Sequence, residues 1–211
     1  MNYQLENQQE VIIMKKLQTV LTGCILTAAL LAAGGCNKQP SSSLSYQDIL
    51  ENGLGLSESE TVERYQIDES SVQKEERDSE EIWTLSEPEE IMGQSATVFL
   101  NFEDDSLTGA SFVISIDNDQ ELVWKTLTDI YKDMEDNLGD PSTHLDDQQP
   151  FDRYTDYAAF SEVITPELET GIYIEANNWE QEDDINGPRA HLLLTMFESG
   201  SSTIEQRVYL P

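Results

Sequence analysis

The chain has 211 residues and a formal net charge of −31, with 42 acidic residues against 11 basic ones. Such a surface repels phosphate backbones and anionic lipid headgroups, so we exclude direct nucleic-acid binding. Hydrophobic residues make up 38% of the chain and fall into periodic segments, which excludes disorder of the main body. The acidic excess is typical of a solvated, highly soluble surface; a cationic partner, bound divalent cations and adaptation to high salt are the alternatives.

The N-terminal segment has the layout of a secretory signal peptide. Met14 is a better start for export than Met1, because two lysines follow it and an apolar stretch then runs over residues 17–33. The stretch ends in small residues, and no stop-transfer charges flank it. We therefore expect residues 1–35 to be an upstream extension and a signal peptide, both removed from the mature protein.

Cys36 stands where this apolar stretch gives way to a serine-rich run. The sequence Ala33-Gly34-Gly35-Cys36 resembles the cleavage box of bacterial lipoproteins, in which small residues precede the cysteine that receives diacylglycerol. It departs from the usual pattern at Ala33, where leucine is common. The resemblance implies that Cys36 carries acyl chains such as palmitate and anchors the protein on the extracytoplasmic face of the cell membrane.

Two alternatives to lipidation at Cys36 are lipidation at Cys24 and an ordinary secretory cleavage without lipid. The run Leu21-Thr22-Gly23-Cys24 matches the cleavage box by letter, but it leaves an apolar region too short for export. With Cys36 acylated, residues 36–43 form a flexible tether and residues 44–211 form an acidic globular domain without a thiol. That domain has no disulfide framework and must be stabilised by an ordinary hydrophobic core.

The first elements of the domain follow from helix and turn signals. Residues 45–52 (SYQDILEN) predict a short helix, and an S-x-x-E capping box at 57–60 opens a second helix that ends near Ile67. We interpret residues 69–80 as a charged linker with little strand character. Strands are then expected at 82–85, 96–102 and 107–116, with a tight hairpin turn between the last two.

The strongest helix signal in the chain begins after residues 117–119 and ends at Gly139. Its apolar residues step by three or four and form one buried stripe: Val123, Leu127, Ile130, Met134 and Leu138. Gly139 followed by Pro141 is a typical helix stop. Strand-like segments return at 154–164, 171–177, 190–198 and 204–210, and Asn186-Gly187 is a turn signal between two of them.

These elements predict an α+β fold, in the approximate order α-α-β-β-β-α-β-β-β-β. Because the strands are sequential and joined by turns, we expect an antiparallel sheet with helices packed on one face. The helix start Leu56-Ser57-x-x-Glu60 and the helix stop at 137–141 (NLGDP) resemble those of small secreted α+β modules of the beta-lactamase inhibitory protein type and of small outer-membrane-assembly lipoproteins. That resemblance implies a binding module rather than an enzyme.

Metal-site patterns in the chain are incomplete. Residues 182–187 (EDDING) imitate the first half of a calcium loop, with Asp183, Asp184 and Asn186 as candidate ligands, but Leu193 stands where the bidentate glutamate belongs. An acidic hairpin loop is the preferred interpretation of the run, so we expect no cofactor, with a weak calcium site as the alternative. His144 and His191 are 47 residues apart, and His191 alternates with Leu192, which predicts a surface side chain.

Candidate contact residues are Trp179 and Asn178, which lie among polar residues near a hairpin end. No nucleophile motif, phosphate loop or zinc motif is present. We therefore expect a membrane-anchored, non-enzymatic binding module for a protein, peptide or envelope component. A carboxylate-dependent extracytoplasmic hydrolase is the alternative hypothesis, and a solute-binding transporter component is disfavoured because it needs two larger lobes.

Overall fold

A computed structural model describes residues 44–77, 79–142, 156–169, 171–180 and 186–211. All of them belong to one compact unit, Ser41–Pro211. The elements in chain order are α2 (Tyr46–Asp48), the π-helical turn η1 (Ile49–Gly53), α3 (Glu58–Tyr65), the 3-10 turn η2 (Glu69–Ser71), β1 (Val72–Arg77), β2 (Glu80–Leu85), β3 (Glu89–Ile91), β4 (Gln94–Glu103), β5 (Ser106–Asp117), α4 (Gln120–Leu138), α5 (Tyr157–Leu168), β6 (Ile172–Trp179), β7 (Arg189–Phe197) and β8 (Ser201–Tyr209).

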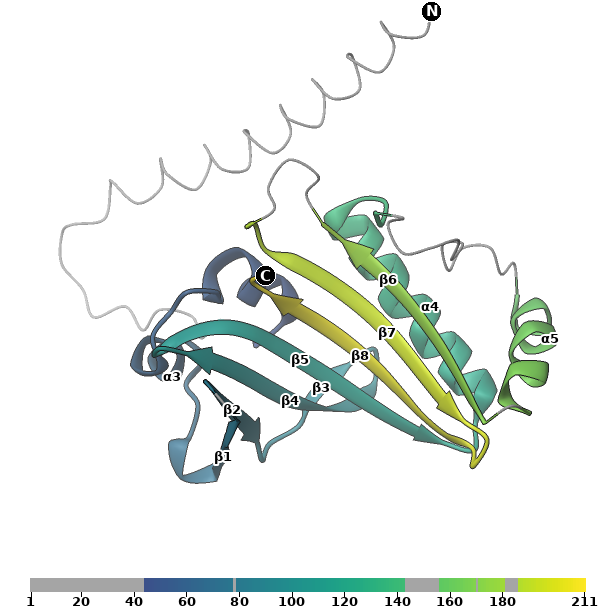
Figure 1. Cartoon of the computed structure of the whole chain (residues 1–211), viewed down its shortest axis with the longest axis horizontal. Helices are drawn as coiled ribbons and strands as arrows, with labels where there is room; N and C mark the ends of the chain where they lie inside the picture. The colour runs from purple at the N-terminus through teal and green to yellow at the C-terminus, as the bar shows by residue number, and fades with distance from the viewer. Residues whose placement is uncertain (1–43, 78, 143–155, 170, 181–185) are drawn as a thin grey trace, which may run out of the picture. The chain divides into compact units, whose positions relative to one another are not determined.

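The strands form one antiparallel sheet in the order β1-β2-β4-β5-β8-β7-β6, and the short strand β3 pairs with β4. β5 and β8 join the earlier strands of the chain to the later ones at the centre of the sheet. Figure 1 shows α4 running along the sheet beside β6 and β7, with α5 near one end of it. The predicted α+β class with an antiparallel sheet is confirmed.

One face of the sheet is covered by helices and forms the core. The buried side chains alternate along each strand: Val98, Leu100 and Phe102 in β4; Ala110, Phe112, Ile114 and Ile116 in β5; Leu192, Leu194 and Met196 in β7; Ile204 and Val208 in β8. α4 adds Val123, Leu127, Ile130 and Met134 to the same cluster. The Tyr46 hydroxyl donates to the Asp133 carboxylate at 3.0 Å and accepts from the Asn137 amide at 3.0 Å, which ties α2 to α4.

Local signals account for the helix boundaries. In α3 the Ser57 hydroxyl accepts from the Glu60 N–H at 3.3 Å and the Glu60 carboxylate accepts from the Ser57 N–H at 2.9 Å, so the predicted capping box is confirmed. The Asp119 carboxylate accepts from the Leu122 N–H at 2.9 Å and begins α4, which ends at Gly139 as predicted. Among the described residues, no helix has both the length and the apolar character needed to cross a membrane.

Two of the predicted elements are wrong. The expected strand at 154–164 is the helix α5 over its described part, because the Asp156 carboxylate caps it by accepting from the Ala159 N–H at 3.0 Å and Phe160 and Ile164 are buried one turn apart. The expected linker at 69–80 contains β1, which pairs with β2 over six residues. The chain therefore has five strands before α4 and three after α5, rather than three and four.

Candidate functional site

The sheet face opposite the helices carries an apolar patch at its β6 edge. Ile172 and Ile174 in β6 are 42% and 51% exposed, and Phe197 in β7, which lies opposite Ile172, is 41% exposed. Among the β6 side chains whose burial the structure describes, Asn177 and Trp179 are buried, whereas the two isoleucines face solvent. We call Ile172, Ile174 and Phe197 the β6–β7 patch. Clustered exposed apolar side chains on a strongly acidic protein are typical of an interaction surface.

A polar row crosses the same face further along β6 and β7, towards the other end of the two strands. The strand register places Asn178, His191, Arg207 and Ser111 in line across β6, β7, β8 and β5. The His191 ring lies edge-on to Tyr209 with 6.0 Å between centroids, and the Arg207 guanidinium carbon lies 5.1 Å from the Tyr209 centroid. Burial lowers the pKa of His191, as does Arg207, and these effects outweigh the opposing attraction of Glu205. Its imidazole is therefore held neutral to a lower pH than in an unfolded chain.

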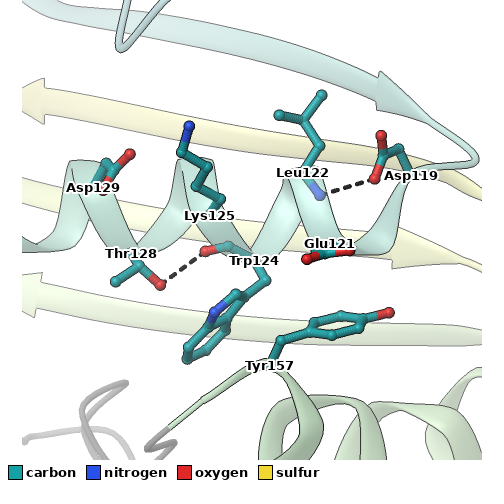
Figure 2. A pocket seen from close by; sticks show the side chains of 8 residues that line it. All are labelled: Asp119, Glu121, Leu122, Trp124, Lys125, Thr128, Asp129 and Tyr157. Atoms are coloured by element: carbon teal, nitrogen blue, oxygen red, sulfur yellow. Dashed lines mark hydrogen bonds between the residues drawn. The ribbon is translucent and has the colours of Figure 1, made fainter.

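A groove lies on the solvent side of α4, on the other side of the sheet from the patch. The α4 groove has a volume of about 500 Å³ and is lined by Asp119, Glu121, Leu122, Trp124, Lys125, Thr128, Asp129 and Tyr157. Figure 2 shows the Trp124 and Tyr157 rings on one side of the helix and Leu122, Lys125 and Asp129 on the other. The groove thus combines an aromatic wall with three carboxylates and one ammonium group.

A second, smaller cavity near the β4–β5 turn is almost wholly acidic. Its volume is about 220 Å³, and it is lined by Glu58, Glu76, Ser79, Glu80, Glu81, Phe102, Asp104 and Asp105. The indole N–H of Trp83 donates to Glu81 at 2.5 Å, and this bond together with Lys74 lowers the Glu81 pKa against the opposing effect of burial. A carboxyl group with a lowered pKa is ionised at neutral pH and is a poor general acid.

The predicted contact residues do not form a surface site. Trp179 is only 6% exposed; its indole N–H donates to the Gly139 carbonyl at 2.8 Å and its ring packs against Tyr131, so the expected exposure of Trp179 is wrong. The reason is that Trp179 lies opposite Ala190 on the helix-covered face. Asn178 is half-buried on the outer face, and its carbonyl accepts from the Ser142 N–H at 2.7 Å.

The remaining predicted residues lie mostly outside the described part of the chain. Cys36, Cys24, His144, Asp183 and Asp184 are among them. Asn186 is described and is exposed in the turn before β7. Within the described ranges, no three His, Cys, Asp or Glu side chains are grouped so that they could hold a metal ion. The calcium site at residues 183–186 therefore stays a prediction.

Comparison with known proteins gives no match: no protein-family model, no curated protein and no solved structure matches the chain. Sequence reasoning missed the β6–β7 patch because alternation alone does not say which face of a strand is buried. It missed the α4 groove because Trp124 and Tyr157 lie on separate helices, and one of these was predicted as a strand. One signal was available in the sequence: Trp124 does not belong to the apolar stripe of α4, and this indicates an aromatic side chain outside the buried face.

Proposed function

We propose that this protein is a lipid-anchored extracytoplasmic module that acts by binding a protein partner through the β6–β7 patch, without catalysing a reaction. The observation that carries the proposal is the grouping of three exposed large apolar side chains, Ile172, Ile174 and Phe197, on neighbouring positions of one uncovered sheet face. The large negative charge keeps the rest of the domain soluble, so a local apolar patch of this kind needs a separate explanation.

The hydrolase alternative has less support. Glycoside-type acid catalysis needs one carboxyl group whose pKa is raised, so that it carries a proton at working pH. Among the described carboxyl groups whose pKa clearly departs from the ordinary value, all depart downward: Asp48, Glu60, Asp68, Glu75 and Glu81. This favours binding over catalysis for the acidic cavity, which Glu81 lines.

The anchoring part of the proposal depends on the thiol of Cys36. We expect the protein extracted from membranes to carry an acylated N-terminal Cys36, detectable by mass spectrometry. Cys36→Ser removes the thiolate that attacks the lipid donor, so that variant should leave the membrane fraction. Cys24→Ser is the matched control and should remain membrane-bound. Retention of the Cys36→Ser protein in membranes would refute the assignment.

The binding part is tested by placing a photo-crosslinking residue at Thr195, which lies opposite Ile174 on the outer face. We expect cross-linked products in cells that express the parent and their loss with Ile174→Asp, because a charge replaces an apolar contact. Met92→Asp is the matched control, since Met92 is 44% exposed and lies in the β3–β4 turn, away from the patch. Undiminished cross-linking in the Ile174→Asp variant would contradict the proposal.

A further inference from the structure

The α4 groove contains an aromatic wall next to carboxylates that have no partner of their own. We propose that this groove binds a small organic cation, a protonated or quaternary amine attached to an apolar group. The proposal is independent of the protein-binding function above, because the groove and the β6–β7 patch lie on opposite sides of the sheet. Three features of the lining favour such a cation: its rings, its charges and its shortage of side-chain hydrogen-bond donors.

The rings are Trp124 and Tyr157, both half-buried. The Phe160 ring lies 5.1 Å from the Trp124 ring, tilted by 35°, and so supports the indole from α5. An ammonium group over an indole face is stabilised by the ring quadrupole. The same domain already contains such a contact, since the Lys74 Nζ lies 3.9 Å from the centroid of Trp83.

The charges in the groove favour a cation. Asp119, Glu121 and Asp129 oppose the single ammonium group of Lys125. Asp119 is engaged as the cap of α4. In the part of the chain that the structure describes, the side-chain carboxylates of Glu121 and Asp129 make no hydrogen bond or ion pair. The negative field of the whole protein raises the local concentration of cations and lowers that of anions.

The lining offers acceptors but few donors. The Thr128 hydroxyl already donates to the Trp124 carbonyl at 2.8 Å, which leaves Lys125, the Tyr157 hydroxyl and the Trp124 indole N–H as the side-chain donors of the lining. A sugar or an anion would need more donors than these. The carboxylates are also not gathered as a metal ion requires, since no such group exists among the described residues. A bulky cation that contacts the two rings and lies beside Glu121 fits both facts.

The test compares choline with 3,3-dimethylbutan-1-ol, a neutral molecule of the same shape, by isothermal titration at constant ionic strength. We expect saturable binding of choline and at least about tenfold weaker binding of the alcohol, because only the cation gains the ring and carboxylate attraction. Trp124→Ala and Glu121→Gln should weaken choline binding several-fold, and Lys125→Gln should strengthen it. Glu135→Gln and Lys132→Gln, on the same helix but outside the groove, are the matched controls and should change nothing.

Three results would overturn the proposal: no saturable binding of choline, equal binding of choline and the alcohol, or equal effects of the groove variants and their controls. Trp124→Ala removes a packing contact with Phe160, so its thermal melt is compared with that of the parent to detect a loss of stability. Glu121 and Lys125 are exposed, so their variants test the groove without a change in core packing. Phosphatidylcholine vesicles form a second arm. Binding to choline and vesicles identifies a lipid headgroup as the source, and binding to choline alone identifies a free amine.

Discussion

At the scale of single residues, His191 is the clearest case of a side chain changed by its surroundings. Its Nδ1 atom is buried without a hydrogen-bond partner, and the ring sits among Arg207, Tyr209 and Glu205 of β8 and faces Asn178 of β6. Loss of water around the ring disfavours the imidazolium form, which lowers the pKa of His191 below the ordinary value of 6.5. The unfolded chain therefore binds this proton more tightly than the folded one.

As a consequence, titration of His191 alone makes the folded state less stable as pH falls. Stability from neutral His191 is fully present above the unfolded pKa of 6.5 and is lost as pH falls from there towards the lower folded pKa. The His191→Gln variant cannot take up this proton. We predict that its melting temperature, relative to that of the parent, rises as pH falls below about 6.5. Thermal melts of both proteins from pH 8 to pH 5 measure this difference. A difference that stays constant across that range would contradict the prediction.

At the scale of elements, α4 connects the two halves of the sheet. Its stripe of Val123, Leu127, Ile130 and Met134 is buried, while its opposite side lines the α4 groove. The helix is thus held by one face and presents the other to solvent. Side chains on the groove face can be changed at little cost to the fold, whereas those of the stripe cannot.

We predict that Leu127→Asp destabilises the domain by several kcal/mol, because Leu127 is 1% exposed and its replacement would bury a charge without a partner. Lys132→Asp places the same side chain on the exposed side of α4 and is the matched control. Urea unfolding of the two variants measures the difference. If Leu127→Asp unfolds at the same urea concentration as Lys132→Asp, the stripe does not belong to the core.

Helices and strands could be predicted from the sequence where nearby residues determine them, and could not where packing against distant residues does. The capping box of α3, the stripe of α4 and the strand β5 are set by neighbours within a few residues. All three are confirmed, with Leu138 at the end of the stripe only partly buried. β1 was missed because its residues Gln73 to Arg77 are polar and pair only as an edge strand, so no buried face marks them. α5 was mistaken for a strand because its aromatic and β-branched residues suit a sheet, and the helix depends on its cap and on packing against β6 and α4.

The candidate sites were less predictable, since each brings together distant parts of the chain. The exposure of Ile174 and the burial of Trp179 depend on which face of β6 meets the helices, and a shift of one residue in register would exchange them. The α4 groove needs Trp124 and Tyr157 from two helices. Neither relation is encoded in local spacing.

At the scale of the whole molecule, charge dominates. Several of the described basic residues are already paired: Arg64 with Asp48 at 2.9 Å, Lys74 with Glu58 and Glu81 at 3.1 Å, and Arg77 with Glu75 at 2.9 Å. These pairs neutralise only a small part of the acidic excess of the chain. Repulsion among the remaining carboxylates opposes the compact state.

We predict that the melting temperature rises as sodium chloride increases from low to moderate concentration, because salt screens charges over a Debye length of about 8–10 Å. A matched series with calcium at constant ionic strength tests the site predicted at Asp183, Asp184 and Asn186. We expect the sodium chloride response without a further calcium increment. A calcium-specific rise would establish the site, and a melting temperature that does not respond to sodium chloride would show that the repulsion does not limit stability.

The place of β8 in the sheet has a consequence for how the chain matures. β8 follows its neighbours β5 and β7 in the chain, yet it lies between them and forms the only strand pairings that join the two halves of the described sheet. During synthesis, the hairpins β4–β5 and β6–β7 can form early, but the sheet cannot close until residues 201–209 have left the ribosome. For the exported protein proposed here, this topology delays the complete sheet until the end of synthesis, so that only separate hairpins precede it while the chain is threaded through a translocation channel.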